Sequence, residues 1–193
     1  MPNYVENVLI ITGDDVDIDN LKHKLNVFNV GDEIDEFFDL FIKNKNADAD
    51  IISWSVANWG TKWDVCDCEV SSLAPFTLKF RTAWSPPITF FKKFAANHYP
   101  TLKFTLAYIE IGEQFYGMIK LKNNIVISEF YKSINEDEDE DEDEDDECIF
   151  VEDDTDCEKY SSNPDYLSID DCIFLHGNLK KFYEKYDFRS LGG

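Results

Sequence analysis

Hydrophobic residues recur at helical spacing in the first part of the chain, after one short apolar run. The run 8–12 ends at Gly13 and predicts a buried strand that leads into a helix. That helix is predicted over 15–27, because apolar residues then follow at spacings of three, four and three. A further helix is predicted over 32–43, with an apolar face that we expect to pack on the domain's own sheet rather than on a partner: Ile34, Phe37, Phe38, Phe41 and Ile42.

The period of the pattern changes to two near residue 51, which is typical of strands with one buried face. Alternation of apolar and polar residues predicts strands at 52–57, 65–70, 76–83 and 102–108. Ser85-Pro86-Pro87 predicts a helix start with Ser85 as the cap, and an apolar stripe extends this helix over 88–98.

The remaining pattern predicts a hairpin followed by a less regular C-terminal part. Residues 115–122 and 125–131 form the two arms of the hairpin, which turns at Asn123-Asn124 because Asn tolerates positive φ. Beyond residue 147, apolar stretches predict a short strand at 148–151, structure at 169–175 and a last amphipathic helix at 179–186.

The predicted order of strand, helix, strand, strand, helix, strand is that of a ferredoxin-like sandwich. We therefore predict an α+β fold in which one antiparallel sheet carries helices 15–27 and 88–98 on one face. Three segments follow from this reading: a ferredoxin-like domain at 1–134, an acidic low-complexity loop at 135–158, and an extension at 159–193 that packs on the same domain.

The formal net charge of −22 is concentrated in one part of the chain. Residues 136–158 contain 17 acids and no Lys or Arg, so the other residues carry about −5. Twelve of these acids are consecutive, too repulsive and too polar to fold alone, and predict a disordered or extended loop. This acidic run consists of Glu136, Asp137, Glu138, Asp139, Glu140, Asp141, Glu142, Asp143, Glu144, Asp145, Asp146 and Glu147.

Such a charge opposes non-specific binding to DNA or RNA, because affinity for a duplex comes largely from Lys and Arg that displace counterions from phosphates. We therefore expect neither a direct nucleic-acid scaffold nor direct binding to a duplex. The negative charge favours a basic partner, either a basic protein or a basic tail. The alternative is that the acidic run only keeps the protein soluble or is a tolerated insertion.

All four tryptophans lie between residues 54 and 84, which predicts either a core or a binding surface there. As a surface, they could stack on a nucleotide or a methylated purine while carboxylates and cations meet its polar groups. As a core, they would pack the joint between the sheet and the second helix, with indole N–H groups bonded to backbone. The candidate ligand-binding residues are Trp59, Lys62, Trp63, Asp64, Arg81, Trp84 and Glu110.

Two tryptophan motifs carry a family resemblance. Asn58-Trp59-Gly60-Thr61-Lys62-Trp63-Asp64, followed by Thr82-Ala83-Trp84-Ser85-Pro86-Pro87, resembles the paired signature of the YubB-type ferredoxin-like family of phages, plasmids and bacteria. The opening Asn3-Tyr4-Val5-Glu6-Asn7 is also similar, with Tyr4 where that family is expected to have Trp. The resemblance covers about residues 2–122 and implies the fold, but it implies no activity. A composition rich in Asn, Lys, Ile, Asp and Phe suggests a viral or mobile-element origin.

Other chemistry has little support in the sequence. Cys66-x-Cys68 suggests a metal site, but no second close pair exists and core thiols are the favoured reading. Five cysteines, no signal peptide and no long apolar run predict an intracellular protein without a transmembrane helix. No phosphate-binding glycine loop is present. We predict no catalytic residue, metal or cofactor, and a non-enzymatic protein whose acidic run engages a basic partner, with ligand binding at the tryptophans as the alternative.

Overall fold

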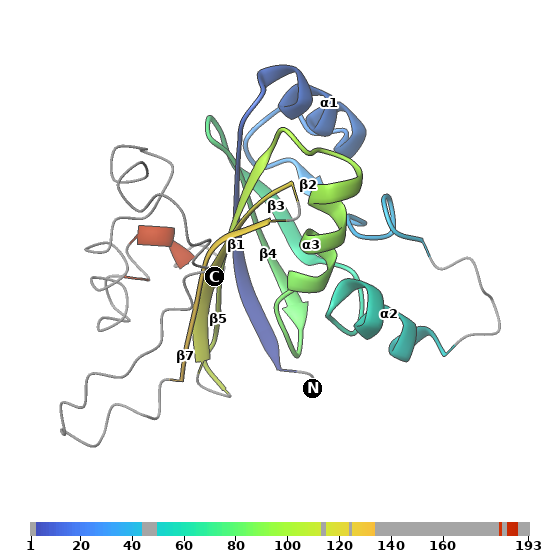
Figure 1. Cartoon of the computed structure of the whole chain (residues 1–193), viewed down its shortest axis with the longest axis vertical. Helices are drawn as coiled ribbons and strands as arrows, with labels where there is room; N and C mark the ends of the chain where they lie inside the picture. Colours follow the sequence, from blue (N-terminus) through green and yellow to red (C-terminus); the bar gives the residue numbers. More distant parts are fainter. Residues whose placement is uncertain are drawn as a thin grey trace, which may run out of the picture.

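The computed structural model describes residues 3–43, 50–112, 115–123, 125–133, 182 and 185–188, apart from the side chains of 95–97. Within these residues, one antiparallel sheet of seven strands has the order β2-β3-β4-β1-β5-β6-β7 (Figure 1). The strands are β1 (Tyr4–Thr12), β2 (Glu33–Ile34), β3 (Cys66–Leu73), β4 (Phe76–Ala83), β5 (Lys103–Glu110), β6 (Phe115–Lys122) and β7 (Ile125–Ser133). The helices are α1 (Asp15–Leu25), α2 (Ile51–Trp59) and α3 (Ile88–Asn97).

Strand β1 lies at the centre of the ferredoxin-like core. It pairs with β4 on one side and with β5 on the other, and β3 lies beyond β4. Helix α1 follows β1 and helix α3 joins β4 to β5, so the predicted succession of strands and helices is present. The predicted ferredoxin-like α+β fold is confirmed, and β2, β6 and β7 extend the sheet at its two edges.

Most predicted elements overlap observed ones. Strands 76–83 and 115–122 coincide with β4 and β6, and the turn residue Asn123 has a φ of 47° as expected. The other confirmed predictions differ only in their ends: strands 8–12, 65–70, 102–108 and 125–131, and helices 15–27 and 88–98.

Helices α1 and α3 cover one face of the sheet, as predicted (Figure 1). Successive strand residues point to opposite faces, so alternate side chains of β1, β4 and β5 form this helix-covered core. Its strand members include Leu9, Ile11, Leu78, Phe80, Phe104 and Leu106, all fully buried. The helices contribute Leu21, Leu25, Phe90, Phe91 and Phe94.

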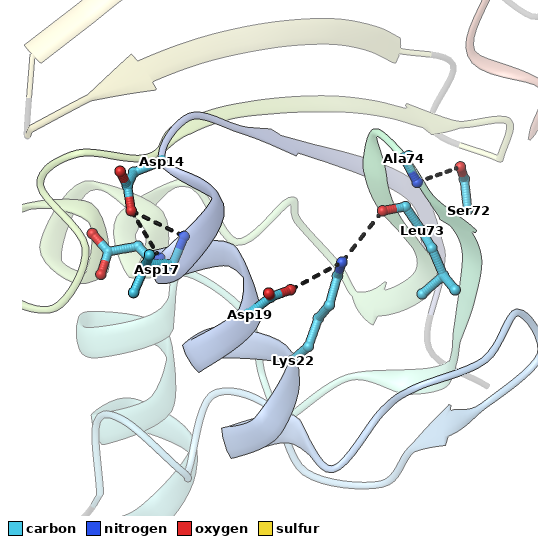
Figure 2. A network of polar contacts seen from close by, with 8 residues as sticks. Asp14, Asp17, Asp19, Lys22, Ser72, Leu73 and Ala74 are labelled. Atoms are coloured by element: carbon cyan, nitrogen blue, oxygen red, sulfur yellow. Dashed lines mark hydrogen bonds and ion pairs between the residues drawn. The ribbon is translucent and has the colours of Figure 1, made fainter.

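Helix α1 is fixed to the hairpin that joins β3 to β4 (Figure 2). The carboxylate of Asp14 caps the helix, accepting from the amides of Val16 at 3.0 Å and Asp17 at 3.1 Å. From the same helix, the ammonium of Lys22 donates to the carbonyl of Leu73 at 3.4 Å. The cap bonds fix the start of the helix, and the Lys22 bond links the helix to the end of the hairpin.

The helix-free face is partly covered by the described C-terminal residues, drawn in red on the opposite side of the sheet from α1 and α3 (Figure 1). Phe182, Tyr186 and Phe188 are buried there against β1, β5, β6 and β7. The ammonium of Lys79, 5% exposed, donates to the Asp187 carboxylate at 2.9 Å and to its carbonyl at 2.6 Å. The acidic run, the predicted structure at 148–151 and 169–175, and most of 179–186 lie outside the described residues.

The predicted strand at 52–57 is wrong, because these residues belong to helix α2. Asp50 caps the helix by accepting from the Ile52 amide at 3.2 Å. The buried residues are Ser55 and Trp59, four apart as on one helix face, whereas Ile52 and Val56 are each 43% exposed. The alternation of apolar and polar residues that predicted a strand therefore mixes residues from the exposed and the buried face of a helix.

The predicted helix over 32–43 is also wrong, because the two-residue strand β2 is followed there by turns. Asp32 caps no helix after it. Its carboxylate accepts from the preceding amides of Phe28 at 2.6 Å and Asn29 at 2.8 Å, and these bonds lower its pKa. The expected burial is nevertheless confirmed for Ile34, Phe37 and Phe38.

None of the helices in the described ranges is long and apolar enough to cross a membrane.

Candidate functional site

The first tryptophan motif ends helix α2 and turns the chain towards β3. Gly60 has a φ of +84°, and its amide donates to the Val56 carbonyl at 3.0 Å, which ends the helix. A Cβ at Gly60 would lie 3.1 Å from Thr89 of α3, so this position has both a conformational and a packing reason for glycine. Trp59 is 7% exposed, and its indole donates to the Ile42 carbonyl at 3.0 Å. Trp59 is therefore a core residue.

The two tryptophan motifs are hydrogen-bonded to each other. The Thr61 hydroxyl donates to the Ala83 carbonyl at 2.8 Å, and the Ser85 hydroxyl donates to the Gly60 carbonyl at 2.5 Å. The Thr82 hydroxyl donates to the Ser85 carbonyl at 2.9 Å. The predicted role of Ser85 as a helix cap is wrong, because its hydroxyl faces the first motif and α3 begins without a side-chain cap.

Asp64 organises the backbone of the segment 37–39. One carboxylate oxygen accepts from the amides of Phe37 at 3.0 Å and Phe38 at 2.8 Å, as well as from Val65 at 2.8 Å. The other oxygen accepts from the Asp39 amide at 2.8 Å. The Asp64 carboxylate is thus the shared acceptor of four backbone amides that belong to no regular helix. Both carboxylate oxygens of Asp64 accept from backbone amides, so the contacts that the structure gives Asp64 are structural.

The exposed Trp84 and the partly exposed Lys62 and Trp63 form a group beside this framework. The ammonium of Lys62 lies 4.3 Å from the ring centroid of Trp84 and 5.0 Å from that of Trp63. Contacts of this kind stabilise by about 0.5–2 kcal/mol each. Trp84 has a φ of +75°, which is uncommon for a residue other than glycine, and 45% of it is exposed.

Arg81 and Tyr4 form a second group on the helix-free face. The guanidinium carbon of Arg81 lies 5.0 Å from the Tyr4 ring centroid, and its Nη2 pairs with the carboxylate of Asp67. Tyr4 is 37% exposed and pairs with Ala83 in the sheet, directly before Trp84. The pKa of the neighbouring Glu6 is raised by burial, an effect that Arg81 partly offsets.

Residues of both groups lie at the end of the sheet where β1 begins, because the Trp84 amide donates to the carbonyl of Asn3, next to Tyr4, at 2.9 Å. We use the name aromatic–cation surface for these five residues: Tyr4, Lys62, Trp63, Arg81 and Trp84. Its rings can stack on planar groups, and its two cations can meet phosphate or carboxylate oxygens. The sequence missed Tyr4 as a member, although an aromatic residue at the matching position of the resembled family was a usable signal.

Glu110 does not belong to this surface. It alternates with Ile109, which faces the C-terminal residues, so its side chain lies on the helix-covered side of β5. The carboxylate is 4% exposed and accepts from the Gly112 amide at 3.0 Å.

The described residues contain no group of three or more His, Cys, Asp or Glu side chains that could hold a metal ion. Cys68 is 2% exposed, and burial raises the pKa of its thiol far above the ordinary value. A buried neutral thiol is a poor metal ligand, which supports the reading of Cys68 as a core residue.

One family model matches part of the chain. Residues 58–152 match the family model described as the ferredoxin-like domain in Api92-like protein. The match begins at Asn58, the first residue of the first tryptophan motif, and its description agrees with the observed fold. No curated protein and no solved structure is significantly similar to the chain.

Asp64 allows a direct test of the framework. Asp64→Ala leaves four amides without their acceptor, and we expect it to lower the free energy of unfolding by about 2–4 kcal/mol. Asp39→Ala is the matched control, because its exposed ion pair with Lys43 should contribute under about 0.5 kcal/mol. Chemical denaturation followed by circular dichroism measures both values. Equal, small effects of the two substitutions would contradict the structural role of Asp64.

Proposed function

We propose that the protein is a non-enzymatic binding protein whose aromatic–cation surface takes a ligand with a planar ring and a negative charge, such as a nucleotide. The observation that carries this proposal is the conformation of Trp84. A residue other than glycine in the left-handed region costs about 1–3 kcal/mol. In spite of this cost, Trp84 is 45% exposed and packs against a cation. Strained backbone that presents an exposed tryptophan is typical of binding sites.

The other motif residues support this proposal by elimination. Trp59 fills the core, Asp64 binds the 37–39 backbone, and Thr61, Thr82 and Ser85 bond the two motifs together. These contacts explain why such residues are needed for the fold. Lys62, Trp63 and Trp84 are partly or largely exposed and make none of these framework bonds with their side chains.

Lys62 also favours one kind of ligand over another. Its ammonium already lies against the rings of Trp63 and Trp84, where a cationic methylated purine would have to stack. Like charges at such short distances repel. An anionic nucleotide instead meets both stacking rings and a cation, so it is favoured over the methylated purine.

The acidic run supports a second proposed function, the binding of a basic protein or basic tail. Strand β7 ends at Ser133, and the run begins three residues later at Glu136. Twelve like charges repel one another, so a cationic partner gains both Coulomb attraction and relief of that repulsion.

We also propose that the protein is related to the YubB-type family, which the paired tryptophan motifs support. The composition supports a viral or mobile-element origin, and the odd number of cysteines supports an intracellular location.

The nucleotide proposal predicts measurable binding of adenosine or guanosine monophosphate by the intact protein. Trp84→Ala should weaken it by about 10- to 100-fold, since a base–aromatic stack contributes about 1–3 kcal/mol. Isothermal titration calorimetry measures the affinity without relying on tryptophan emission. Tyr131→Ala is the control, because Tyr131 is an aromatic residue of β7 that is 62% exposed. Absence of binding to the unaltered protein, or equal effects of both substitutions, would refute the proposal.

The acidic-run proposal predicts that partners are recovered through electrostatics. Pull-down from a cell lysate should recover basic proteins at low salt and lose them as the Debye length falls to about 8 Å at physiological ionic strength. A form in which a Gly/Ser linker replaces 136–147 should not recover them. Recovery of the same partners by both forms at the same salt would leave the run as a solubilising insertion.

A further inference from the structure

We propose that strands β6 and β7 carry a site for an arginine side chain of the basic partner, made by the rings of Phe115 and Tyr131 and the carboxylate of Glu129. We name these three residues the arginine site. This inference rests on the proposed binding of a basic protein or basic tail, and it places a contact for that partner among the described residues. It follows from the register of the strands, the exposure of Tyr131 and the sign of the neighbouring charges.

The sheet register brings aromatic residues of three neighbouring strands together on one face. Gly117 of β6 pairs with Tyr108 of β5 on one side and with Tyr131 of β7 on the other. Residues paired across strands point to the same face, and Tyr108 belongs to the helix-covered core. Phe115, two residues before Gly117, points to this face as well. Its ring stacks on that of Tyr131, with 5.7 Å between centroids and 29° between planes.

Gly117 allows the Tyr108 ring to lie across β6 towards β7. A Cβ at Gly117 would lie 2.5 Å from the Tyr108 hydroxyl, so a larger residue there would displace this ring. The Tyr108 ring also contacts Phe115 edge-on, at 6.3 Å between centroids. Burial raises the pKa of Tyr108, and the negative charge of Glu129 adds to this effect, as expected for a carboxylate close to the hydroxyl. Tyr108 thus supports the arginine site from below.

Tyr131 presents its ring to solvent beside these packed rings. It is 62% exposed, whereas Tyr108 is buried and Phe115 is half-buried. Helix α3 packs on β5 and β6, and the described C-terminal residues lie on the opposite face of the sheet (Figure 1). A ring that a neighbouring ring already holds in place loses little side-chain entropy when a ligand stacks on it.

The described charges on this side of the rings are negative. Glu129 precedes Tyr131 by two residues on β7 and therefore points to the same face, and Glu110 pairs with Phe115 across β5 and β6. Lys132 pairs with a residue of the opposite face. Among the described residues, no cation lies over the Tyr131 ring or pairs with Glu129. Such a site attracts cations and repels the phosphate of a nucleotide.

A planar cation suits this arrangement better than a compact one. The guanidinium of arginine can stack on the exposed Tyr131 ring and also donate two parallel hydrogen bonds to the Glu129 carboxylate. The ammonium of lysine is a strongly hydrated point charge without a flat face. The site therefore distinguishes arginine from lysine, whereas long-range attraction by the acidic run depends only on the charge of the partner.

The arginine site is close along the chain to the acidic run. Glu136 follows Tyr131 by five residues, which span at most about 18 Å when fully extended. A basic segment that the run attracts is therefore brought within reach of the site. The run would determine how fast and over what range a partner is attracted, and the site would determine the preferred side chain.

Fluorescence anisotropy with the full chain at low salt tests this inference. The probes are two fluorescein-labelled peptides of equal length and charge, one of alternating arginine and glycine and one of alternating lysine and glycine. The arginine peptide should bind about two- to fivefold tighter. Tyr131→Ala should weaken its binding by about two- to fivefold and remove most of this preference, whereas Tyr131→Phe keeps the ring and should preserve both. Phe28→Ala is the control, because Phe28 is 50% exposed and lies elsewhere; it should change neither affinity.

Glu129→Gln provides a further variant, because it keeps the size of the side chain and removes only the charge. It should weaken binding of the arginine peptide by about two- to fivefold. If Tyr131→Ala changes neither affinity while a Gly/Ser linker in place of 136–147 abolishes binding, the arginine site fails and the acidic-run proposal stands. If Tyr131→Ala weakens binding and the linker does not, the site stands and the acidic-run proposal fails. If the unaltered protein binds neither peptide, both fail.

Discussion

The carboxylate of Asp64 is the interaction on which the arrangement of the helix-side core depends. It gathers the amides of Phe37, Phe38 and Asp39, which have no regular helix to satisfy them, and buried amides without partners are costly. With this backbone fixed, the rings of Phe37 and Phe38 enter the core, where Phe38 lies 4.5 Å from Phe90 of α3 between ring centroids. The Ile42 carbonyl at the end of the same segment then receives the Trp59 indole.

This arrangement divides the tryptophan motifs into two sets. Some side chains bond to backbone: Asp64 accepts from the amides of 37–39, and Ser85 donates to the Gly60 carbonyl at the end of α2. Lys62, Trp63 and Trp84 contact one another instead, and their rings remain accessible in part. The fold thus serves as a rigid support for a small surface at one end of the sheet. Because strands and hydrogen-bonded turns already hold such a site in one geometry, little conformational entropy is lost on binding.

The sequence predicted β4 because apolar residues alternate regularly with polar ones along it, although the polar residues Thr77 and Lys79 are buried as well. It failed at 52–57, where a nine-residue helix was read as a strand because both patterns fit so short an apolar stretch. It failed at 32–43 because the acceptor for that backbone is Asp64, more than 20 residues away, and periodicity contains no such information. For the same reason it could not separate Trp59 from Trp84, since only tertiary contacts decide which indole is buried.

The central claim is that Trp63 and Trp84 meet a ligand while Trp59 belongs to the core. A ¹H–¹⁵N spectrum of the intact protein, with indole signals assigned by Trp→Phe replacements, tests it during titration with adenosine or guanosine monophosphate. We predict that the indole signals of Trp63 and Trp84 shift and that the signal of Trp59, bonded to the Ile42 carbonyl, stays in place. A titration in which Trp59 shifts most, or in which Trp63 and Trp84 do not move, would contradict the account.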